Sequence, residues 1–327
     1  MNSEDFSREV RLGGPNIMNS NFLLSVIVPV FNEQEMIDLL LKRLLPVVKN
    51  YQYEIIFIND GSTDKTPTII KKVIATNKNI RLVTFYRNFG HQMALTCGYQ
   101  LAKGDAIISI DSDLQDPPEI IPKMIEKWQN GAKIVYAKRE KRQADSFLKK
   151  ITAKSFYKLI NLLSDTPIPD DVGDFRLLDR EVVDFLNRLK EKSRFLRGLV
   201  AWGGYPAGYV YFSREKRLAG NTHYGFLKML NFAFEGIASF SVKPLRIATY
   251  FGFLAGLFGF LELIYHFIRK IFYPQYYVTG WAGLFAGIMF LGGIQLITIG
   301  IIGEYIGKIY QELQGRPQFL IKEKNNL

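Results

Sequence analysis

Two apolar stretches near the end of the chain, 247–268 and 281–302, constrain its fold more than any other feature. Each exceeds the roughly 18 apolar residues that suggest a membrane-spanning helix. Only residues 269–280 separate them, so the two helices have to run in opposite directions. We therefore expect a transmembrane hairpin over 244–306, with both chain ends on one side of the membrane. Buried core helices are the alternative, and two such stretches in series argue against it.

Basic residues are distributed unequally around the expected hairpin and so predict its orientation. Those before the first apolar stretch and after the second are Lys243, Arg246, Lys308, Arg316, Lys322 and Lys324, against Arg269 and Lys270 in the link. The positive-inside rule then predicts a multi-pass protein of the cell membrane, with the rest of the chain and a basic tail at 307–327 in the cytoplasm. The pairs Gly252/Gly256 and Gly283/Gly287 would let neighbouring copies approach closely, which predicts a homo-oligomer.

The composition of the 327 residues narrows the class of protein and of site. Apolar residues at 48% and charged residues at 22% exclude a disordered or fibrous chain. A single cysteine, Cys97, excludes a disulfide framework and a cysteine zinc cage, and three histidines argue against a histidine metal site. The 42 Lys and Arg against 31 Asp and Glu give a charge of +11, which favours nucleotides, phospholipids or nucleic acid as partners. Residues 1–20 lack a signal-peptide pattern and are expected to be a flexible leader.

Short β-rich runs alternate with segments of helical periodicity over 21–192. Apolar strands that alternate with helices predict βαβ units, and hence a mostly parallel, Rossmann-like α/β domain over this range. Ligands of such sheets bind at the carboxyl ends of the strands. The expected strands are Leu24–Val30, Glu54–Asn59, Arg81–Tyr86, Ala106–Asp111 and Lys133–Ala137.

Acidic side chains follow two of the expected strands. Asp111 and Asp113 are one residue apart, and a backbone turn would let both carboxylates reach a divalent cation that bridges substrate phosphates. Such pairs are common by chance, and helix-capping acids are the alternative. Asp60 precedes the tight turn that Gly61 permits, where its carboxylate would accept hydrogen bonds from a base or ribose. An ordinary loop is the alternative there.

Two later segments, 193–202 and 224–240, combine aromatic and aliphatic residues with Arg and Lys. Helices of this composition can lie in the interface of a bilayer. An ordinary helix that faces a protein core is the alternative. Because the apolar stretches follow, we interpret 193–243 as an interfacial amphipathic segment between the α/β domain and the hairpin.

Four motifs together resemble glycosyltransferase family 2. They are Val26–Glu33, Asn59–Asp64, Arg87–Gly90 and Asp111–Pro118. Each is weak alone, and the combination is specific. Within the family the chain resembles the polyprenyl-phosphate glycosyltransferases of the dolichol-phosphate mannose synthase-like branch. The bacterial O-antigen (bactoprenol) glucosyltransferases share its two-helix tail, and the resemblance covers nearly all of 22–316.

The resemblance implies a GT-A catalytic domain, a nucleotide-diphosphate sugar donor and Mg²⁺ or Mn²⁺ as cofactor. By position it implies a nucleotide-sugar site at Pro29, Phe31, Glu33, Asp60, Arg87, Asp111, Arg217 and His223. It also implies a metal site at Asp111, Asp113 and Gln115, catalytic roles for Asp113, Asp174 and Arg176, and contacts of Arg139, Lys154 and Ser155 with the acceptor lipid phosphate. His223 departs from the family pattern, which usually has lysine there; contact with phosphate would favour its cationic form.

The reaction that the resemblance implies is transfer of a hexose from a UDP-sugar to undecaprenyl phosphate. A phosphate oxygen of the lipid would attack the anomeric carbon, UDP would leave, and the anomeric centre would be inverted. Asp174 is the candidate general base, but a phosphate monoester has its second pKa near 6 and is already largely a dianion. We expect Asp174 to orient the acceptor or to stabilise positive charge on the sugar. Glucose is the expected sugar, with mannose and an N-acetylhexosamine as alternatives.

Three other functions fit parts of the sequence. A processive polysaccharide synthase would carry a Gln-x-x-Arg-Trp motif and more membrane helices, but no tryptophan here follows an arginine. A non-enzymatic, nucleotide-sugar-binding membrane scaffold would tolerate loss of the strand-end acids, all of which are present. Nucleic-acid binding rests on charge alone, because no recognised motif accompanies it.

Overall fold

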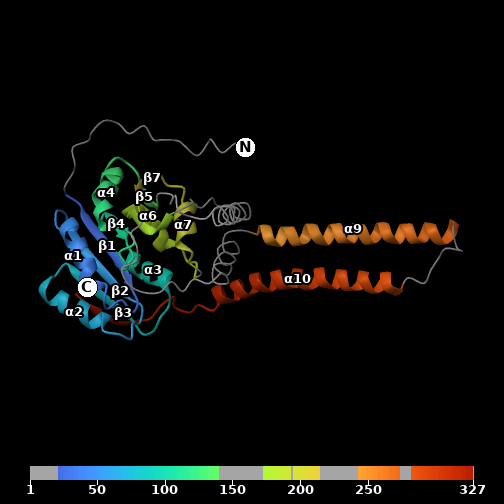
Figure 1. Ribbon diagram of the computed structural model, residues 1–327, viewed down its shortest axis with the longest axis horizontal. Coiled ribbons are helices and arrows are strands. Elements are labelled where there is room, and N and C mark those ends of the chain that lie inside the picture. The colour runs from blue at the N-terminus through green and yellow to red at the C-terminus, as the bar shows by residue number, and fades with distance from the viewer. Residues whose placement is uncertain (1–20, 140–171, 193, 214–241, 273–280, 327) are drawn as a thin grey trace. The chain divides into compact units, whose positions relative to one another are not determined.

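The computed structural model describes residues 21–139, 172–192, 194–213, 242–272 and 281–326 (Figure 1). These residues belong to two compact units, one that contains a β-sheet and one that contains two long helices. The expected leader and the amphipathic segment 224–240 lie outside the described residues.

The sheet has eight strands in the order β7-β5-β6-β4-β1-β2-β3-β8. Four neighbouring strands in the middle, β4-β1-β2-β3, are parallel. Strand β6 is antiparallel to both of its neighbours, and β8 is antiparallel to β3. The mostly parallel α/β sheet expected from the sequence is therefore confirmed. The strands are β1 Leu23–Val30, β2 Gln52–Asn59, β3 Ile80–Phe85, β4 Ala106–Ser109, β5 Ile134–Arg139, β6 Val172–Asp179, β7 Ala207–Phe212 and β8 Ile321–Asn325.

Helices connect the parallel strands because their apolar residues recur at helical spacing. In α1, five apolar side chains between Ile37 and Val48 share one buried face against the sheet. Helix α3 packs so closely on β1 that a Cβ at Gly98 would collide with Ile27. The helices of this unit are α1 Ile37–Val48, α2 Thr66–Thr76, α3 His91–Leu101, α4 Ile121–Gln129 after the 3-10 turn η1 Pro118–Ile120, α6 Arg180–Arg188 and α7 Leu196–Trp202.

The sheet extends beyond the expected domain 21–192. Strand β7 pairs with β5, and β8, from the end of the chain, pairs with β3. Helix α7 lies in the segment expected at a membrane interface, but Leu196, Leu199 and Val200 are buried in the sheet-containing unit. For these side chains the core-facing alternative holds, because they pack inside the protein instead of meeting a bilayer.

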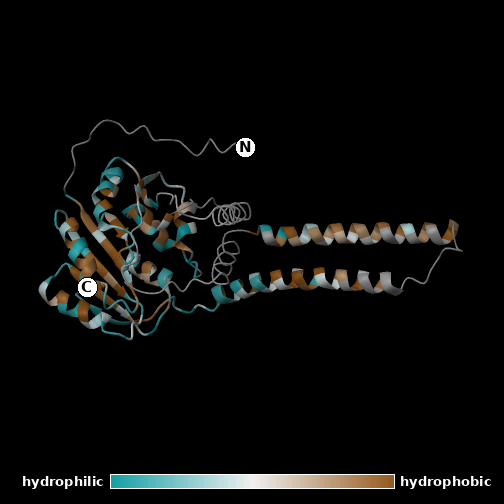
Figure 2. Cartoon of the chain, in the orientation of Figure 1, coloured by the Kyte–Doolittle hydropathy of each residue, from teal (hydrophilic) through white to brown (hydrophobic). Residues whose placement is uncertain are grey.

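Two long helices occur where the hairpin was expected. Helices α9, Lys243–Phe272, and α10, Trp281–Leu313, lie side by side (Figure 1). Both are predominantly hydrophobic along their length (Figure 2). Among the described residues, Phe290–Leu313 has the length and hydropathy of a membrane span, and Leu245–Leu261 forms a shorter apolar stretch.

Candidate active site

The carboxyl ends of β1, β2 and β4 bring the predicted motifs to one edge of the sheet. Asp60 follows β2, and Asp111 follows β4 after one residue. Strand β6 runs the other way and pairs Arg176 with Ser109, so Asp174, near the start of β6, also lies at this edge. The topology therefore assembles side chains that are more than a hundred residues apart in the sequence.

A strained turn carries the predicted metal ligands. Leu114 is buried and has a φ of 53°, a left-handed conformation that non-glycine residues seldom adopt. The backbone N–H of Gln115 donates to Asp113 Oδ1 at 3.1 Å. The turn thus follows β4 closely and fixes the Asp113 carboxylate to the backbone of Gln115, two and four residues after Asp111.

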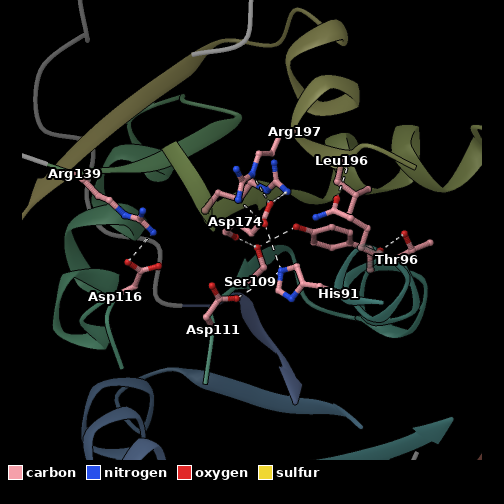
Figure 3. Close-up of polar contacts among 12 residues, drawn as sticks. His91, Thr96, Ser109, Asp111, Asp116, Arg139, Asp174, Leu196 and Arg197 are labelled. Atoms are coloured by element: carbon pink, nitrogen blue, oxygen red, sulfur yellow. Dashed lines mark hydrogen bonds and ion pairs between the residues drawn. The ribbon is translucent and has the colours of Figure 1, made fainter. Parts of the chain in front are cut away.

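Asp174 is the most heavily paired carboxylate of the edge (Figure 3). Arg197 donates to both of its oxygens, at 3.2 Å from Nε and 2.9 Å from Nη2, and Arg176 Nη2 lies 3.0 Å from Oδ1. Burial alone would raise the pKa of Asp174, but a hydrogen bond from His91 and the two guanidinium charges hold it well below its ordinary value. Asp174 is therefore a charged, fully occupied carboxylate.

His91 joins Asp174 to the Asp-Ser-Asp turn. Its Nε2 lies 3.4 Å from Asp174 Oδ2 and 3.6 Å from Asp111 Oδ1 (Figure 3). Burial would lower the pKa of His91, but these two carboxylates outweigh burial and raise it. The pKa of Asp111 is raised by withdrawal from water, and the charges of Asp174 and Asp113 act in the same direction. These carboxylates thus lie close enough to influence one another, and a cation beside Asp111 would favour its charged form.

The described residues fit a divalent cation that is also held by substrate. Among them no group of three His, Cys, Asp or Glu side chains is placed to enclose a metal ion. Two carboxylates and one amide on the turn are instead the hard oxygen donors that Mg²⁺ shares with substrate phosphates and water. The chemistry of these oxygen donors therefore fits a divalent cation.

Arg139 ends β5 on the other side of the site. Its Nη2 lies 3.6 Å from Oδ1 of the buried Asp116, which follows the Asp-Ser-Asp turn (Figure 3). A Cβ at Gly173 would lie 3.3 Å from the same Nη2, so a larger residue there would crowd the guanidinium. Arg139 remains about one-third exposed. The guanidinium is therefore oriented by Asp116 and still open to a ligand.

Asp60 organises the backbone of the predicted donor side. Its Oδ1 and Oδ2 accept the N–H groups of Phe89 and Gly90, at 2.6 and 2.9 Å. The sequence predicted that this carboxylate would point toward a base or ribose; in the structure it holds the loop 86–90. The Arg87 guanidinium lies 4.2 Å from the centre of the Phe89 ring. Asp60 therefore shapes this loop from within.

The other predicted donor residues follow β1. Pro29 is within that strand, Phe31 is 43% exposed directly after it, and the N–H of Glu33 donates to Thr66 Oγ1 at 2.9 Å. The exposed Phe31 ring offers a stacking surface at the edge where Asp60 and Arg87 lie. Four predicted residues lie outside the described residues: Lys154, Ser155, Arg217 and His223.

Two models of known families match this chain. Residues 25–186 match glycosyl transferase family 2, and residues 243–309 match the GtrB C-terminal hairpin. The chain is 45% identical over 301 residues to the prophage bactoprenol glucosyl transferase homolog of Escherichia coli K12, covering 91% of this chain and 98% of that protein. It is also 45% identical to the bactoprenol glucosyl transferase of Shigella phage SfX, covering 92% and 99%. The chain belongs to glycosyltransferase family 2.

Within the family, the chain is a glycosyltransferase, and it is similar to proteins named bactoprenol glucosyl transferase and to the GtrB C-terminal hairpin. Its sheet-containing unit is a GT-A fold. Among solved structures, the chain matches glucosyl-3-phosphoglycerate synthase from Mycobacterium tuberculosis at 19% identity and a TM-score of 0.44, covering 67% of this chain and 78% of that one.

Two residues of the site were absent from the sequence prediction. His91 begins α3 one residue after the Arg87–Gly90 motif, and Arg197 belongs to α7, which the sequence assigned to a membrane interface. Proximity of His91 to a recognised motif was a usable signal. No local pattern reveals that Arg197 reaches Asp174, because the pairing depends on how α7 packs beside β6.

Replacing Asp174 by asparagine should lower the free energy of unfolding at pH 7 by about 3–5 kcal/mol, because buried Arg176 would lose its anionic partner. Chemical denaturation of the purified full-length protein in detergent measures this. The matched control is Asp184→Asn, in an exposed pair with Arg180, which should cost less than about 1 kcal/mol.

The difference in the free energy of unfolding between wild type and Asp174→Asn should also depend on pH, in a direction that the lowered pKa of Asp174 sets. Because the pKa of Asp174 is lower in the folded chain than in the unfolded chain, its contribution is complete above the ordinary carboxyl value of about 3.9. The contribution is lost as the pH falls through the folded value. The gap between wild type and Asp174→Asn should therefore be full at pH 7 and shrink below about pH 4. A gap that widened on acidification would contradict the assignment.

Proposed function

We propose that the protein transfers glucose from UDP-glucose to a polyprenyl phosphate, undecaprenyl phosphate in the first instance, and releases UDP. The observation that carries the proposal is one sheet edge that holds both acidic and basic groups: Asp111 and Asp113 on the turn after β4, Arg139 paired with Asp116, and Arg197 paired with Asp174. Transfer between two phosphate compounds needs such an edge, because it must hold a diphosphate through a cation and a second phosphate through guanidinium groups. The names of the relatives support glucose and a bactoprenol acceptor.

On the donor side, we assign the nucleoside to Phe31, the loop 86–90 and Pro29. The exposed ring of Phe31 suits stacking on a base, and Arg87 supplies positive charge for phosphate. Asp60 then acts through the loop that it holds. Arg217 and His223 are assigned to the diphosphate from the family resemblance alone, and Glu33 to the nucleoside on the same basis.

Mg²⁺ or Mn²⁺ is assigned to Asp111, Asp113 and Gln115. When bound there, the cation would neutralise the charge that develops on the leaving diphosphate. The turn at Leu114 presents these donors, and Gln115 N–H holds the Asp113 carboxylate in place.

On the acceptor side, Arg139 is assigned to the lipid phosphate. A guanidinium can hold a phosphate through two parallel hydrogen bonds, and Asp116 keeps that of Arg139 oriented. Lys154 and Ser155 are assigned to the same phosphate from the resemblance alone.

Asp174 is better suited to positioning than to removing a proton. A carboxylate with a strongly lowered pKa is a weak base, and a lipid phosphate monoester is already largely a dianion. Asp174 instead fixes Arg197 and His91, which are about 31% and 39% exposed and face the edge where the phosphates would meet. Arg176 keeps Asp174 in place from the buried side. A single displacement by the acceptor oxygen then inverts the anomeric carbon.

The acceptor's hydrocarbon tail requires a membrane, and α9 and α10 are assigned as a hairpin that crosses it twice. Large apolar side chains are exposed along both helices, for example Phe253 at 70% and Leu296 at 72%, which suits contact with lipid. The unequal distribution of Lys and Arg supports a cytoplasmic catalytic domain. A Cβ at Gly252, Gly256 or Gly287 would meet nothing within 4 Å, so these faces are open to a second copy in a homo-oligomer.

Replacing Asp113 by asparagine should abolish transfer, with a loss of at least about a hundredfold, because the amide keeps the shape of the side chain but removes the charge that the cation needs. The measurement is the initial rate with radiolabelled UDP-glucose in Mg²⁺, and EDTA should have the same effect on the wild type. Asp184→Asn makes the same chemical change on exposed α6 and should keep full activity. Full activity of Asp113→Asn would rule out the metal assignment.

Replacing Arg139 by alanine should raise the KM for polyprenyl phosphate about tenfold or more and leave the KM for UDP-glucose within about twofold, because a methyl group cannot bind phosphate. Initial rates in detergent micelles with each substrate varied in turn measure both constants. Arg188→Ala, on the exposed face of α6, controls for the loss of a surface charge. An equal rise of the two constants would refute the assignment to the acceptor.

A further inference from the structure

Strand β8, near the end of the chain, is the outermost strand of the sheet beside β3. It lies next to residues 86–90, which we call the donor loop. Strand β8 pairs with β3 from Leu82–Asn325 to Phe85–Ile321, and the N–H of Tyr86 donates to the carbonyl of Leu320 at 3.1 Å. Both family matches end before this segment, at residues 186 and 309. The tail strand is therefore a feature of the catalytic unit that neither match includes.

Contacts along its whole length hold the tail strand on β3. Glu323 forms an ion pair of 2.7 Å with Lys71 of α2. Asn326 Nδ2 donates to the carbonyls of Lys78 and Ile80, at 2.6 and 2.9 Å. Gln318 Nε2 donates to the carbonyl of Glu191 at 2.7 Å, in the link before α7. These bonds hold the residues before and after the strand, so side-chain contacts as well as the backbone pairing with β3 determine its position.

An aromatic series connects the tail to the donor loop. Phe319 stacks on Phe85 with ring centres 5.0 Å apart and planes 11° apart. Phe85 is 1% exposed and meets Phe89 edge-on at 5.8 Å. The Arg87 guanidinium lies over the Phe89 ring, 4.2 Å from the ring centre. Aromatic pairs of this geometry have preferred orientations, so a displacement of one ring would shift the ring that packs against it.

The donor loop 86–90 is thus held by two segments of the chain, the turn after β2 and the tail. Asp60, directly after β2, accepts the N–H groups of Phe89 and Gly90. A Cβ at Gly61 would lie 2.5 Å from the Arg87 carbonyl carbon, so the turn after β2 packs closely against the loop. The tail contacts Tyr86 of the loop and Phe85 directly before it. Gly90 is followed directly by His91, whose ring contacts Asp111 and Asp174.

We propose that the tail segment 318–325, through Phe319, is a positioning element of the donor loop that sets the affinity for the nucleotide. This inference rests on the proposed assignment of loop 86–90 to the UDP-sugar. The tail follows α10 in the chain after residues 314–317 only, so the segment that supports nucleotide binding is the continuation of the hairpin. Simple protection of an exposed sheet edge is the competing explanation, and it predicts an effect on stability without selectivity for the donor.

The test compares Phe319→Ala with Phe319→Tyr and Lys322→Ala in the full-length protein in detergent. Phe319→Tyr keeps the stacking ring, and Lys322 is an exposed residue of the same strand. Phe319→Ala should weaken binding of UDP, and raise the KM for UDP-glucose, by about tenfold, with the KM for polyprenyl phosphate within about twofold. The other two variants should stay within about twofold of the wild type in all three quantities. Amide hydrogen exchange in 86–90 should become faster in Phe319→Ala alone.

The other possible results of this comparison also decide whether the tail positions the donor loop. Unchanged UDP binding and unchanged exchange in 86–90, or equal changes in both KM values with a lower melting temperature, would overturn the inference in favour of edge protection. If Phe319→Ala does not fold, Phe319→Leu keeps apolar volume without the stacked ring and takes its place under the same criteria. A wild type that neither binds UDP nor transfers glucose would refute the proposed function instead, and hydrogen exchange in 86–90 would still decide whether the tail positions the loop.

Discussion

A buried carboxylate without a cationic partner is unstable, and the arrangement of this site depends on how the chain provides partners for Asp174. Burial of such a group costs several kcal/mol unless opposite charges and hydrogen bonds compensate. Arg176 meets this requirement from within β6, Arg197 from α7 and His91 from α3. Strand β6, helix α7 and helix α3 therefore meet around Asp174, at the carboxyl ends of β1, β2 and β4. The side chains that would handle phosphate are positioned by that convergence.

The packing of these elements around Asp174 also brings two kinds of charged group to this edge of the sheet, carboxylates and guanidinium groups. Carboxylates of the Asp-Ser-Asp turn follow β4, and the guanidinium groups of Arg139 and Arg197 are each oriented by an acidic partner. An acid thus orients each arginine, and the carboxylates of Asp111 and Asp113 follow β4 at the same edge. That division is what a reaction between a diphosphate donor and a phosphate acceptor requires, because each phosphate meets positive charge from a different source.

Local patterns predicted the parts of the fold that depend on local physics. The central strands and the carboxylates behind them were read from apolar runs and from residues one or two positions beyond the strand ends, because periodicity and strand-end geometry are encoded over short distances. The tail strand β8 was read as a basic tail, since alternating Lys and Glu with few apolar residues gives no strand signal. Its pairing with β3 joins residues more than two hundred positions apart, and so do its bonds to Lys71 and Lys78. The same limit explains why the pairing of Arg197 with Asp174, and the backbone bonds of Asp60, became visible only in three dimensions.

The central claim is a single displacement at the anomeric carbon by a lipid phosphate. The most direct measurement is to incubate the purified protein with Mg²⁺, undecaprenyl phosphate and α-linked UDP-glucose labelled at the anomeric carbon, and to determine the products and the configuration of the new bond by NMR. The account predicts one UDP released for each glucose transferred, and a β-linked glucosyl phosphate on the lipid. Label that stays in the water-soluble fraction, or an α-linked lipid product, would contradict it.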